Sequence, residues 1–555
     1  MTAELAFVNG AVYTVDAARS RAQAVAVTDG RIAAVGTDED VRDLIGPRTE
    51  VIDLAGRMLL PGFQDAHVHP PSGGLEMLQC DLNDVYTAPE YQRVIADYVA
   101  AHPDRPWILG GGWYMSAFPG GAPDRRILDA IVPDRPVALF SRDGHSLWVN
   151  TTALERAGLD ATTPDPIDGR IERDEDGPSG TLHEGAVHLV DRHAPEPTAL
   201  ELEEGLRLAQ RYLHSLGITA WQDAIVGGHY DTLGLYRSFA ASGELTARVV
   251  GALWWDRHRG REQVEELVAI RDEGPVGRFR PSSVKIMQDG IVENFTAGCL
   301  DPYLDEDGNP TDRRGLSFVE PEELKEIVAE LDERGMQAHF HTIGERAVRE
   351  ALDAIEHARD RNGPSDNRHH LAHIQVIHPD DVPRFRALSA VANGQPLWAT
   401  YESQMVDLTI PFLGEERATW QYPFGSLVRS GATLAFGSDW SVSSPDPMKE
   451  MHVAVNRRVR PEGLDVSGGS RRAVEEVFLP DERIDLETAT AAFTIGSAYV
   501  NHLDDVTGSI QVGKLADLTV VDRDLFAHPV EEIALATVDA TFVEGERVFT
   551  RDGSS

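Results

Sequence analysis

The stretch P-E-E-L-K-E-I-V-A-E-L-D-E-R-G-M-Q-A-H-F-H-T-I-G, residues 321–344, contains one helix followed by one strand. Apolar residues recur at helical spacing between Pro321 and Glu333, which predicts an amphipathic helix over those residues. The run Gln337–Ile343 is typical of a short buried strand. Arg346–Ala358 repeats the helical spacing, so helix and strand alternate here.

The same alternation extends through the middle of the chain and predicts the fold class. Eight strands in strand–helix alternation is the count of a (β/α)8 TIM barrel, an α/β fold. Besides Gln337–Ile343, the predicted strands are Met58–His69, Ile218–Ala224, Arg248–Trp255, Val284–Gly290, His369–Val376, Ala390–Gln395 and Thr433–Trp440.

Both ends of the chain predict β structure instead. Asn9-Gly10 and Asp29-Gly30 indicate hairpin turns between short apolar runs, and residues 513–522 and 540–549 have a similar strand composition. We therefore expect a small β-sandwich domain built from both termini. Nearly 150 residues separate the first two predicted barrel strands, too many for a simple connection, so we expect an inserted subdomain over the barrel mouth. The predicted boundaries are 1–57 with 504–555 for the β domain, 58–72 with 198–503 for the barrel, and 73–197 for the insertion.

Composition excludes several classes of partner. The formal net charge of −40 argues against binding nucleic acid or an anionic membrane, since both require clustered cations. There are two cysteines, Cys80 and Cys299, which excludes a disulfide framework and favours a cytoplasmic location. No signal peptide or membrane-spanning run is recognisable. We expect a small-molecule substrate; whether the chain forms a homodimer is left open.

Four histidines and one aspartate fall at the carboxyl ends of predicted strands, where barrel active sites lie. His67 and His69 are two residues apart and share one face of their strand. His341, His373 and Asp439 lie near the ends of three other strands. Nitrogen and oxygen donors of this kind suit zinc or another divalent ion such as manganese or iron. The sequence thus predicts a metal centre.

Other histidines compete for these roles. His339 shares the face of His341 but lies further from the strand end, so His341 is preferred as a ligand. His369 and His370 begin their strand and are expected far from the mouth. Lys285 is one of four lysines in the chain and lies inside an apolar strand; taken alone, it predicts only a buried stem whose amine reaches solvent.

Taken together, the motifs resemble the amidohydrolase superfamily. Within it the chain is similar to the YtcJ-like amidohydrolases, which include N-substituted formamide deformylases. The resemblance covers almost the whole chain and rests on P-G-F-Q-D-A-H-V-H (61–69), D-G-H-S-L-W-V-N (143–150), V-K-I-M-Q-D-G (284–290), H-T-I-G-E-R-A (341–347), L-A-H-I-Q (371–375) and G-S-D-W (437–440). One departure is Glu345, where that group usually has aspartate.

The resemblance implies a role for Lys285. In binuclear members, a lysine on the fourth strand reacts with carbon dioxide to give a carbamate that bridges two metals, here expected to be zinc. Burial and nearby positive charge favour the neutral amine that this reaction needs. His67, His69 and Asp439 would then bind one ion, and His341 and His373 the other. The alternative is a single-metal site in which Lys285 orients the substrate.

The expected reaction is hydrolysis of an amide-type C–N bond by a metal-activated hydroxide, with Asp439 as general base and acid. Trp113, Tyr114, His145 and Ser146 of the insertion are candidates for substrate contact. The alternatives are strong, since Trp113 would equally serve as a core residue and His145 as a hydrogen-bonded loop residue. Glu184 is either an extra carboxylate at the centre or a charge at a helix N-terminus.

Three other functions fit parts of the pattern. A mononuclear deaminase would use Glu345 as its acid, although Lys285 argues against it. A hydrolase of C–O bonds, as in esters or lactones, would have the same metal centre. A barrel that binds ligands without catalysis is disfavoured because the set of ligand residues is complete.

Overall fold

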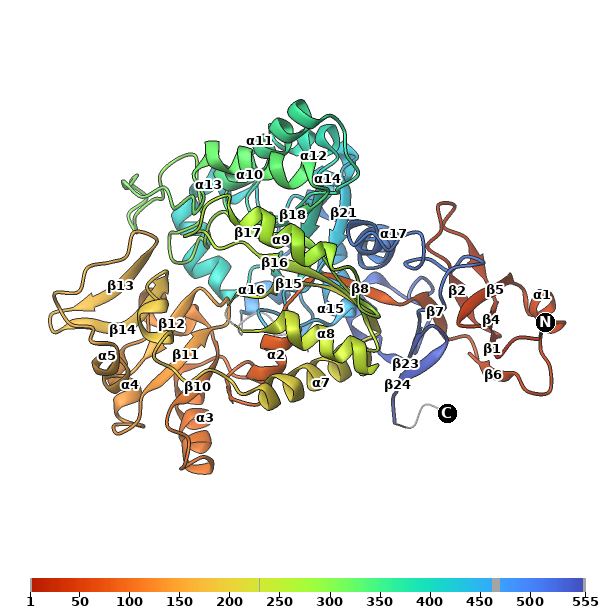
Figure 1. Cartoon of the computed structure of the whole chain (residues 1–555), viewed down its shortest axis with the longest axis horizontal. Helices are drawn as coiled ribbons and strands as arrows, with labels where there is room; N and C mark the ends of the chain where they lie inside the picture. Colours follow the sequence, from red (N-terminus) through yellow and green to blue (C-terminus); the bar gives the residue numbers. More distant parts are fainter. Residues whose placement is uncertain (1, 229, 462–469, 553–555) are drawn as a thin grey trace.

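The computed structural model describes residues 2–228, 230–461 and 470–552 (Figure 1). Its centre is a sheet of eight parallel strands in the spatial order β21-β20-β19-β18-β17-β16-β15-β8. The strands are β8 (Phe63–Val68), β15 (Ile218–Val226), β16 (Arg248–Trp254), β17 (Phe279–Met287), β18 (Gln337–Thr342), β19 (His370–His373), β20 (Val391–Gly394) and β21 (Thr433–Phe436). The predicted barrel is confirmed as a nearly closed one.

Helices connect these strands and cover the outside of the barrel. They are α7 (Ala199–Ser215), α8 (Thr232–Ser242), α9 (Gln263–Asp272), α10 (Pro321–Glu333), α11 (Glu345–Asn362), α12 (Val382–Leu388), α14 (Phe424–Ser430) and α15 (Pro447–Asn456). Helix α10 has the predicted bounds. It begins at Pro321, which suits the first helical position, and Glu320 caps it by accepting from two backbone amides.

The last strand meets the first at the seam of the barrel. The Asp439 amide donates to the His67 carbonyl at 2.7 Å. Ser438 donates through both its amide and its hydroxyl to Asp65 of β8. Gly437 permits this approach, because a Cβ at that position would lie 2.4 Å from the His67 nitrogen. The two strand ends that carry His67 and Asp439 are therefore fixed to each other directly.

The first predicted strand, Met58–His69, is in fact two strands, so this prediction is corrected. β7 (Met58–Pro61) pairs with strands of the terminal β unit, and only β8 belongs to the barrel. The chain passes from one sheet to the other at Gly62, where a Cβ would lie 2.3 Å from Thr219 Oγ1 of β15. The apolar run is continuous because both strands are fully buried.

Two sheets form the terminal β unit. One has the order β5-β4-β1-β6 and the other β24-β23-β22-β7-β2-β3, so the second sheet combines both ends of the chain. Their strands are β1 (Leu5–Val8), β2 (Ala11–Tyr13), β3 (Arg21–Ala22), β4 (Ala24–Thr28), β5 (Arg31–Gly36), β6 (Glu50–Asp53), β22 (Leu518–Val521), β23 (Val538–Val543) and β24 (Glu546–Thr550). Apolar side chains from both sheets pack into one core.

Of the two hairpin turns predicted here, one is correct and one is wrong. Asp29-Gly30 joins the antiparallel strands β4 and β5, with positive φ at both residues. Asn9-Gly10 instead carries the chain from one sheet to the other, since β1 pairs with β4 and β6 whereas β2 pairs with β3 and β7. Gly10 is required there because a Cβ would lie 2.2 Å from Leu54 Cδ1.

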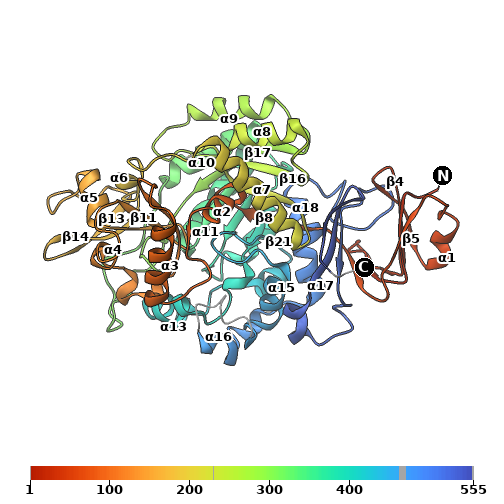
Figure 2. The same cartoon turned by 90° about the horizontal axis from the view of Figure 1, so that it is seen from below.

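The long segment after β8 forms its own six-stranded sheet, in the order β13-β14-β12-β11-β10-β9. The strands are β9 (Cys80–Asp81), β10 (Ile108–Trp113), β11 (Val137–Ser141), β12 (Ser146–Val149), β13 (Gly169–Asp174) and β14 (Gly177–Glu184), accompanied by α3 (Ala88–Ala101), α4 (Arg125–Asp129) and α5 (Thr151–Ala157). Figures 1 and 2 show this insertion and the terminal β unit on opposite sides of the barrel. Within the described ranges, no helix has the length and apolar character needed to cross a membrane.

Candidate metal centre

The side chains singled out as metal ligands all lie at one end of the barrel sheet. His67 is near the end of β8, His373 ends β19, and Asp439 follows β21. Each is buried, with at most 6% of its surface exposed. Parallel strands point their carboxyl ends toward the same rim, which explains why residues so distant in sequence meet here.

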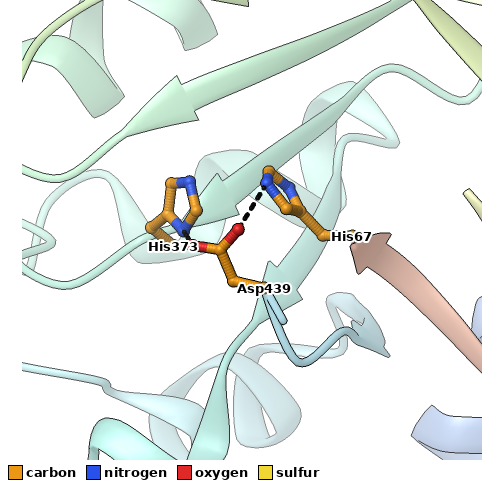
Figure 3. A group of neighbouring side chains, drawn as sticks. All are labelled: His67, His373 and Asp439. Carbon is orange, nitrogen blue, oxygen red and sulfur yellow. Dashed lines mark ion pairs between the residues drawn. The ribbon is translucent and has the colours of Figure 1, made fainter. Parts of the chain in front are cut away.

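Asp439 is the centre of this group (Figure 3). Its Oδ1 lies 3.2 Å from His67 Nε2 and 2.9 Å from His69 Nε2. Its Oδ2 lies 3.9 Å from His373 Nδ1. One ligand atom from each of His67, His373 and Asp439 lies within 4.8 Å of the others, so these three residues could hold one metal ion.

Lys285 and His341 extend the group. Lys285 Nζ lies 3.3 Å from His67 Nε2, and the residue is 1% exposed. Burial lowers the pKa of Lys285 to about 7, so a large share of the amine is neutral at neutral pH. The His341 and His373 rings are in contact, with centroids 4.4 Å apart. All six predicted ligand residues are thus neighbours, and their roles as ligands stay a prediction.

The donor set suits a divalent metal ion. Burial lowers the pKa values of His67, His341 and His373 well below 6.5, so their imidazoles are neutral and keep a free lone pair. Burial raises the pKa of Asp439, but contacts with His69 and His373 outweigh it and keep the carboxyl ionised. Neutral imidazoles around one carboxylate are the donors that zinc and similar ions take.

The backbone at this site is held in an uncommon conformation. His373 has φ 73° and Asp439 has φ 56°, values in the left-handed region that residues other than glycine rarely adopt. Such conformations persist only where the surrounding structure imposes them, and they concentrate at functional sites. At Asp439 the imposing contact is the hydrogen bond that its backbone amide donates to the His67 carbonyl.

A second layer of residues orients the histidines. His339 Nε2 lies 2.8 Å from His67 Nδ1, which leaves Nε2 of His67 facing Asp439. Asp289 Oδ1 lies 3.3 Å from His341 Nδ1, and Asp289 also accepts from the amides of Ile343 and Gly344. Gln395 Oε1 lies 3.1 Å from His373 Nδ1. Partners of this type fix the tautomer and the ring orientation of a metal-binding histidine.

Sequence reasoning did not assign these supporting roles. Asp289 follows the Lys285 strand in V-K-I-M-Q-D-G, and a buried carboxylate directly after a strand was the available signal. His369 lies away from the site and binds Asp332, as expected for a residue before its strand. His370 packs on His339, with ring centroids 4.0 Å apart, behind the metal-binding rim.

A cavity that is partly open to solvent lies over the group. Both the barrel and the insertion line it: Asp439, His341 and His373 come from the former, Tyr114 and His145 from the latter. Trp398 also lines the cavity and stacks on the His373 ring.

Two of the four predicted substrate contacts do not line this cavity. Trp113 is fully buried inside the insertion, where its Nε1 donates to the Leu139 carbonyl at 2.8 Å. Ser146 is also fully buried and contacts His183 Nδ1 at 2.8 Å. For both residues, the packing role described above is the one the structure shows.

His145 and Glu184 form a buried ion pair beside the metal-binding group. Glu184 oxygens lie 3.0 and 3.1 Å from His145 Nδ1, and the carboxylate also accepts from Asn294 and Thr296. Burial opposes both charges, yet the pairing raises the pKa of His145 to about 9 and lowers that of Glu184 to about 2. The His145 ring lies 5.2 Å from that of His341. Glu184 is the last residue of strand β14 and does not lie at the start of a helix. The alternative prediction, a charge at a helix N-terminus, is therefore wrong.

Glu345, the acid that a deaminase would need, is fully buried and does not line the cavity. Its Oε1 accepts from the Leu300 amide at 3.0 Å and lies 3.8 Å from Arg417. The residue therefore holds a loop in place near the mouth.

Relatives of known sequence match the chain over nearly its full length. Protein LONG AFTER FAR-RED 3 of Arabidopsis thaliana is 30% identical over 99% of this chain and 92% of its own. The putative amidohydrolase YtcJ of Bacillus subtilis (strain 168) is 28% identical over 98% of both chains. The N-substituted formamide deformylase of Arthrobacter pascens is 28% identical over 99% of both.

A solved structure of a metal-dependent hydrolase also matches the chain over nearly its full length. An uncharacterized metal-dependent hydrolase from Pyrococcus furiosus superposes with a TM-score of 0.69 at 26% identity, covering 94% of this chain and 99% of that one.

The chain thus has an eight-stranded parallel barrel with histidines and an aspartate at its carboxyl rim, where barrel enzymes have their active sites. The model of the amidohydrolase family matches residues 50–549. The chain belongs to the amidohydrolase family, and the predicted resemblance is confirmed.

Proposed function

We propose that this enzyme uses bound divalent metal to hydrolyse an amide-type C–N bond, with N-substituted formamides as the first substrates to test. The observation that carries the proposal is the convergence of His67, His69 and His373 on Asp439 below an open cavity. The similarity to an N-substituted formamide deformylase supports the choice of bond and substrate.

His67, His69 and Asp439 would hold one ion, and His341 with His373 a second. Zinc fits the donors best, and manganese or iron are alternatives. When bound, such an ion polarises a carbonyl oxygen and makes water acidic enough to react near neutral pH.

Asp439 is the residue that moves protons. Its Oδ1 is engaged by two imidazoles, whereas Oδ2 has one distant contact, to His373 at 3.9 Å. Oδ2 is therefore the atom placed to take a proton from the attacking water and deliver it to the leaving nitrogen. Because the pKa of this carboxyl is lowered, it is ionised and ready to accept before the reaction begins.

Lys285 is proposed to carry the carbamate. The neutral amine adds to the carbon of CO2 and loses one proton, which leaves an N-carboxylate anion whose two oxygens are carried by the carbon now bonded to Nζ. The amine lies 3.3 Å from a ligand nitrogen of His67, so these oxygens would form among the metal ligands. Burial, which lowers the pKa of Lys285 to about 7, supplies the neutral amine.

His145 is proposed to contact the substrate. It lines the cavity next to His341 and is held in its charged form by Glu184. A cationic imidazole N–H at that position would donate a hydrogen bond to the carbonyl oxygen as negative charge develops on it.

The competing deamination is less well supported, because Glu345 is occupied elsewhere. The deciding experiment is a turnover screen of N-substituted formamides, other N-acyl amines, cyclic amides, esters and aminopurines with zinc- and manganese-loaded protein, with metal content measured on the same sample. Turnover of an amide supports the proposal. Turnover confined to esters or aminopurines, or none by protein loaded with two metals, overturns it.

A further inference from the structure

One part of the cavity wall carries carboxyl groups that the proposed reaction does not use. Asp143, Glu293 and Glu402 line the same cavity as the metal-binding histidines. Together with Tyr114 and Tyr422 we call these residues the acidic wall. They come from the insertion and from loops that follow different strands, so separate parts of the chain direct carboxyl groups into one space.

These carboxyl groups have few partners. Thr409 donates to Glu293 at 2.6 Å, and Asp143 accepts from Ser141 and from the His145 amide. In the described part of the chain, Glu402 has no side-chain hydrogen bond or ion pair. Burial, reinforced by the charge of Glu293, raises the pKa of Glu402 to about 8.

Arg142, a cation in the same lining, lowers the pKa of Glu402 but does not offset burial. Its Nε donates to the Val442 carbonyl at 2.8 Å and its Nη1 to the Asn83 carbonyl at 2.7 Å. Among the residues the structure describes, no ion pair within 4.0 Å joins Arg142 to a carboxylate. The other cation, His145, is already paired with Glu184. The wall therefore gathers carboxyl groups without a close cationic partner, and burial raises the pKa values of Glu293 and Glu402 because the nearby cations do not offset it. A cation bound between them would favour their ionised forms.

Two tyrosines provide independent evidence for a ligand. Tyr422 is 2% exposed and Tyr114 is 5% exposed, and both line the cavity. Neither hydroxyl has a hydrogen-bond partner among the described residues. The two side chains are almost entirely buried and line the cavity without a protein partner for their hydroxyls, so both hydroxyls are available to a group that binds there. Aromatic faces beside carboxylates are also the surroundings in which proteins bind organic cations.

We propose that the acidic wall selects a substrate that carries a positively charged nitrogen away from the scissile bond, and that Glu402 and Glu293 bind this nitrogen. The inference extends the proposed amide hydrolysis by naming the class of its substrate. A cation there would favour the ionised forms of both carboxyl groups, and its aliphatic surface can pack on Tyr422. The Tyr114 ring already packs against the Arg142 guanidinium, which lies 4.9 Å from the ring centroid.

The test compares two probes of the same shape on metal-loaded, full-length enzyme. Choline and 3,3-dimethylbutan-1-ol differ in charge, and the quaternary nitrogen cannot coordinate a metal, so binding to the metal centre does not confuse the result. Calorimetric titration should give choline at least tenfold tighter binding. Glu402→Gln should reduce that preference at least fivefold, Glu293→Gln should reduce it in the same direction, and Glu323→Gln should leave it unchanged. Glu323 is exposed on α10 and loses the same charge far from the cavity.

Equal binding of the two probes by the wild type overturns the inference, as does a preference that survives both wall variants. The binding measurement needs no turnover, so it separates this inference from the proposed function. If the enzyme prefers choline but hydrolyses no amide, the proposed role of the acidic wall is supported and the proposed reaction is overturned. If the enzyme hydrolyses a neutral formamide faster than the same formamide with an added ammonium group, the proposed role of the acidic wall is overturned and the proposed amide hydrolysis is not.

Discussion

The backbone amide of Asp439 donates to the carbonyl oxygen of His67 at 2.7 Å, while the Asp439 carboxylate lies 3.2 Å from the His67 ring. The two residues are thus in contact through their main chains and also through their side chains. The backbone contact fixes where the carboxylate stands, and the side-chain contact places it among the imidazoles. Geometry at the metal centre therefore depends directly on closure of the barrel.

Asp439→Asn should retain much of the bound metal and lose turnover by at least about 100-fold, because the amide keeps an oxygen donor and cannot accept a proton. Metal content and kcat, measured on the same preparation, check this. Asp104→Asn, an exposed change far from the cavity, is the matched control. Near-normal kcat in Asp439→Asn would show that another group moves the proton.

Lys285→Ala should lose at least one of the two proposed metals and most of the activity. Bicarbonate supplied with a short-chain carboxylic acid should restore part of that activity, since a free carboxylate can occupy the space that the carbamate leaves. Lys325→Ala serves as control, because Lys325 lies on α10 and pairs with Glu322. Full metal content and full activity in Lys285→Ala would rule out a bridging carbamate.

Asp289→Asn should weaken metal binding by about 10- to 100-fold, the usual effect of losing a carboxylate behind a ligand histidine. Asp289 contacts His341 and three backbone amides, so the neutral side chain leaves the ring less firmly oriented. Competition with a chelator of known affinity measures the change. An unaltered metal affinity would argue against His341 as a ligand.

Asp332 links helix α10 to the loop before β19 and should make stability depend on pH. Burial raises the pKa of this carboxyl, but hydrogen bonds from His369, Ser365, Asn362 and Asn367 outweigh burial and hold it below 3.8. Since the folded-state pKa is depressed, the stabilisation is fully present above about pH 4 and is lost as pH falls through the folded-state pKa.

Asp332→Asn should accordingly lower the free energy of unfolding at pH 7 by about 2 kcal/mol. The difference from wild type should shrink below pH 4, where the wild-type carboxyl becomes protonated. Urea unfolding at several pH values measures it, with Asp104→Asn as control. A difference that does not change with pH would mean that packing, not charge, makes the contribution.

The sequence predicts the barrel well because each unit carries local signals. Helix α10 is correct at both ends since the proline, the capping glutamate and the apolar spacing all lie within the segment. The split between β7 and β8 was missed because both strands are buried on both faces, so hydrophobicity does not change at Gly62. The crossing at Asn9-Gly10 was missed for a related reason: the dipeptide defines a turn and not the sheet in which the next strand pairs.

In the site, too, features set by local sequence patterns could be predicted and features set by long-range contacts could not. Strand alternation and the common rim of a parallel barrel are enough to bring His67, His373 and Asp439 together. The contacts of Asp289 and Gln395 depend on how loops fold back, which no local pattern describes. Trp113 shows the limit in the insertion, where sequence does not reveal which face of a strand is turned to the cavity and which to the core.

The seam between the first and last barrel strands also bears on how the protein is made. His69 and Asp439 lie 370 residues apart in the chain. At a synthesis rate of about 5–20 residues per second, the first strand leaves the ribosome roughly 20–70 s before its partner exists. During that interval the apolar strands β7 and β8 have neither β22 nor β21 to cover them. Overproduction in cells is therefore expected to depend on a chaperone that shields the early strands.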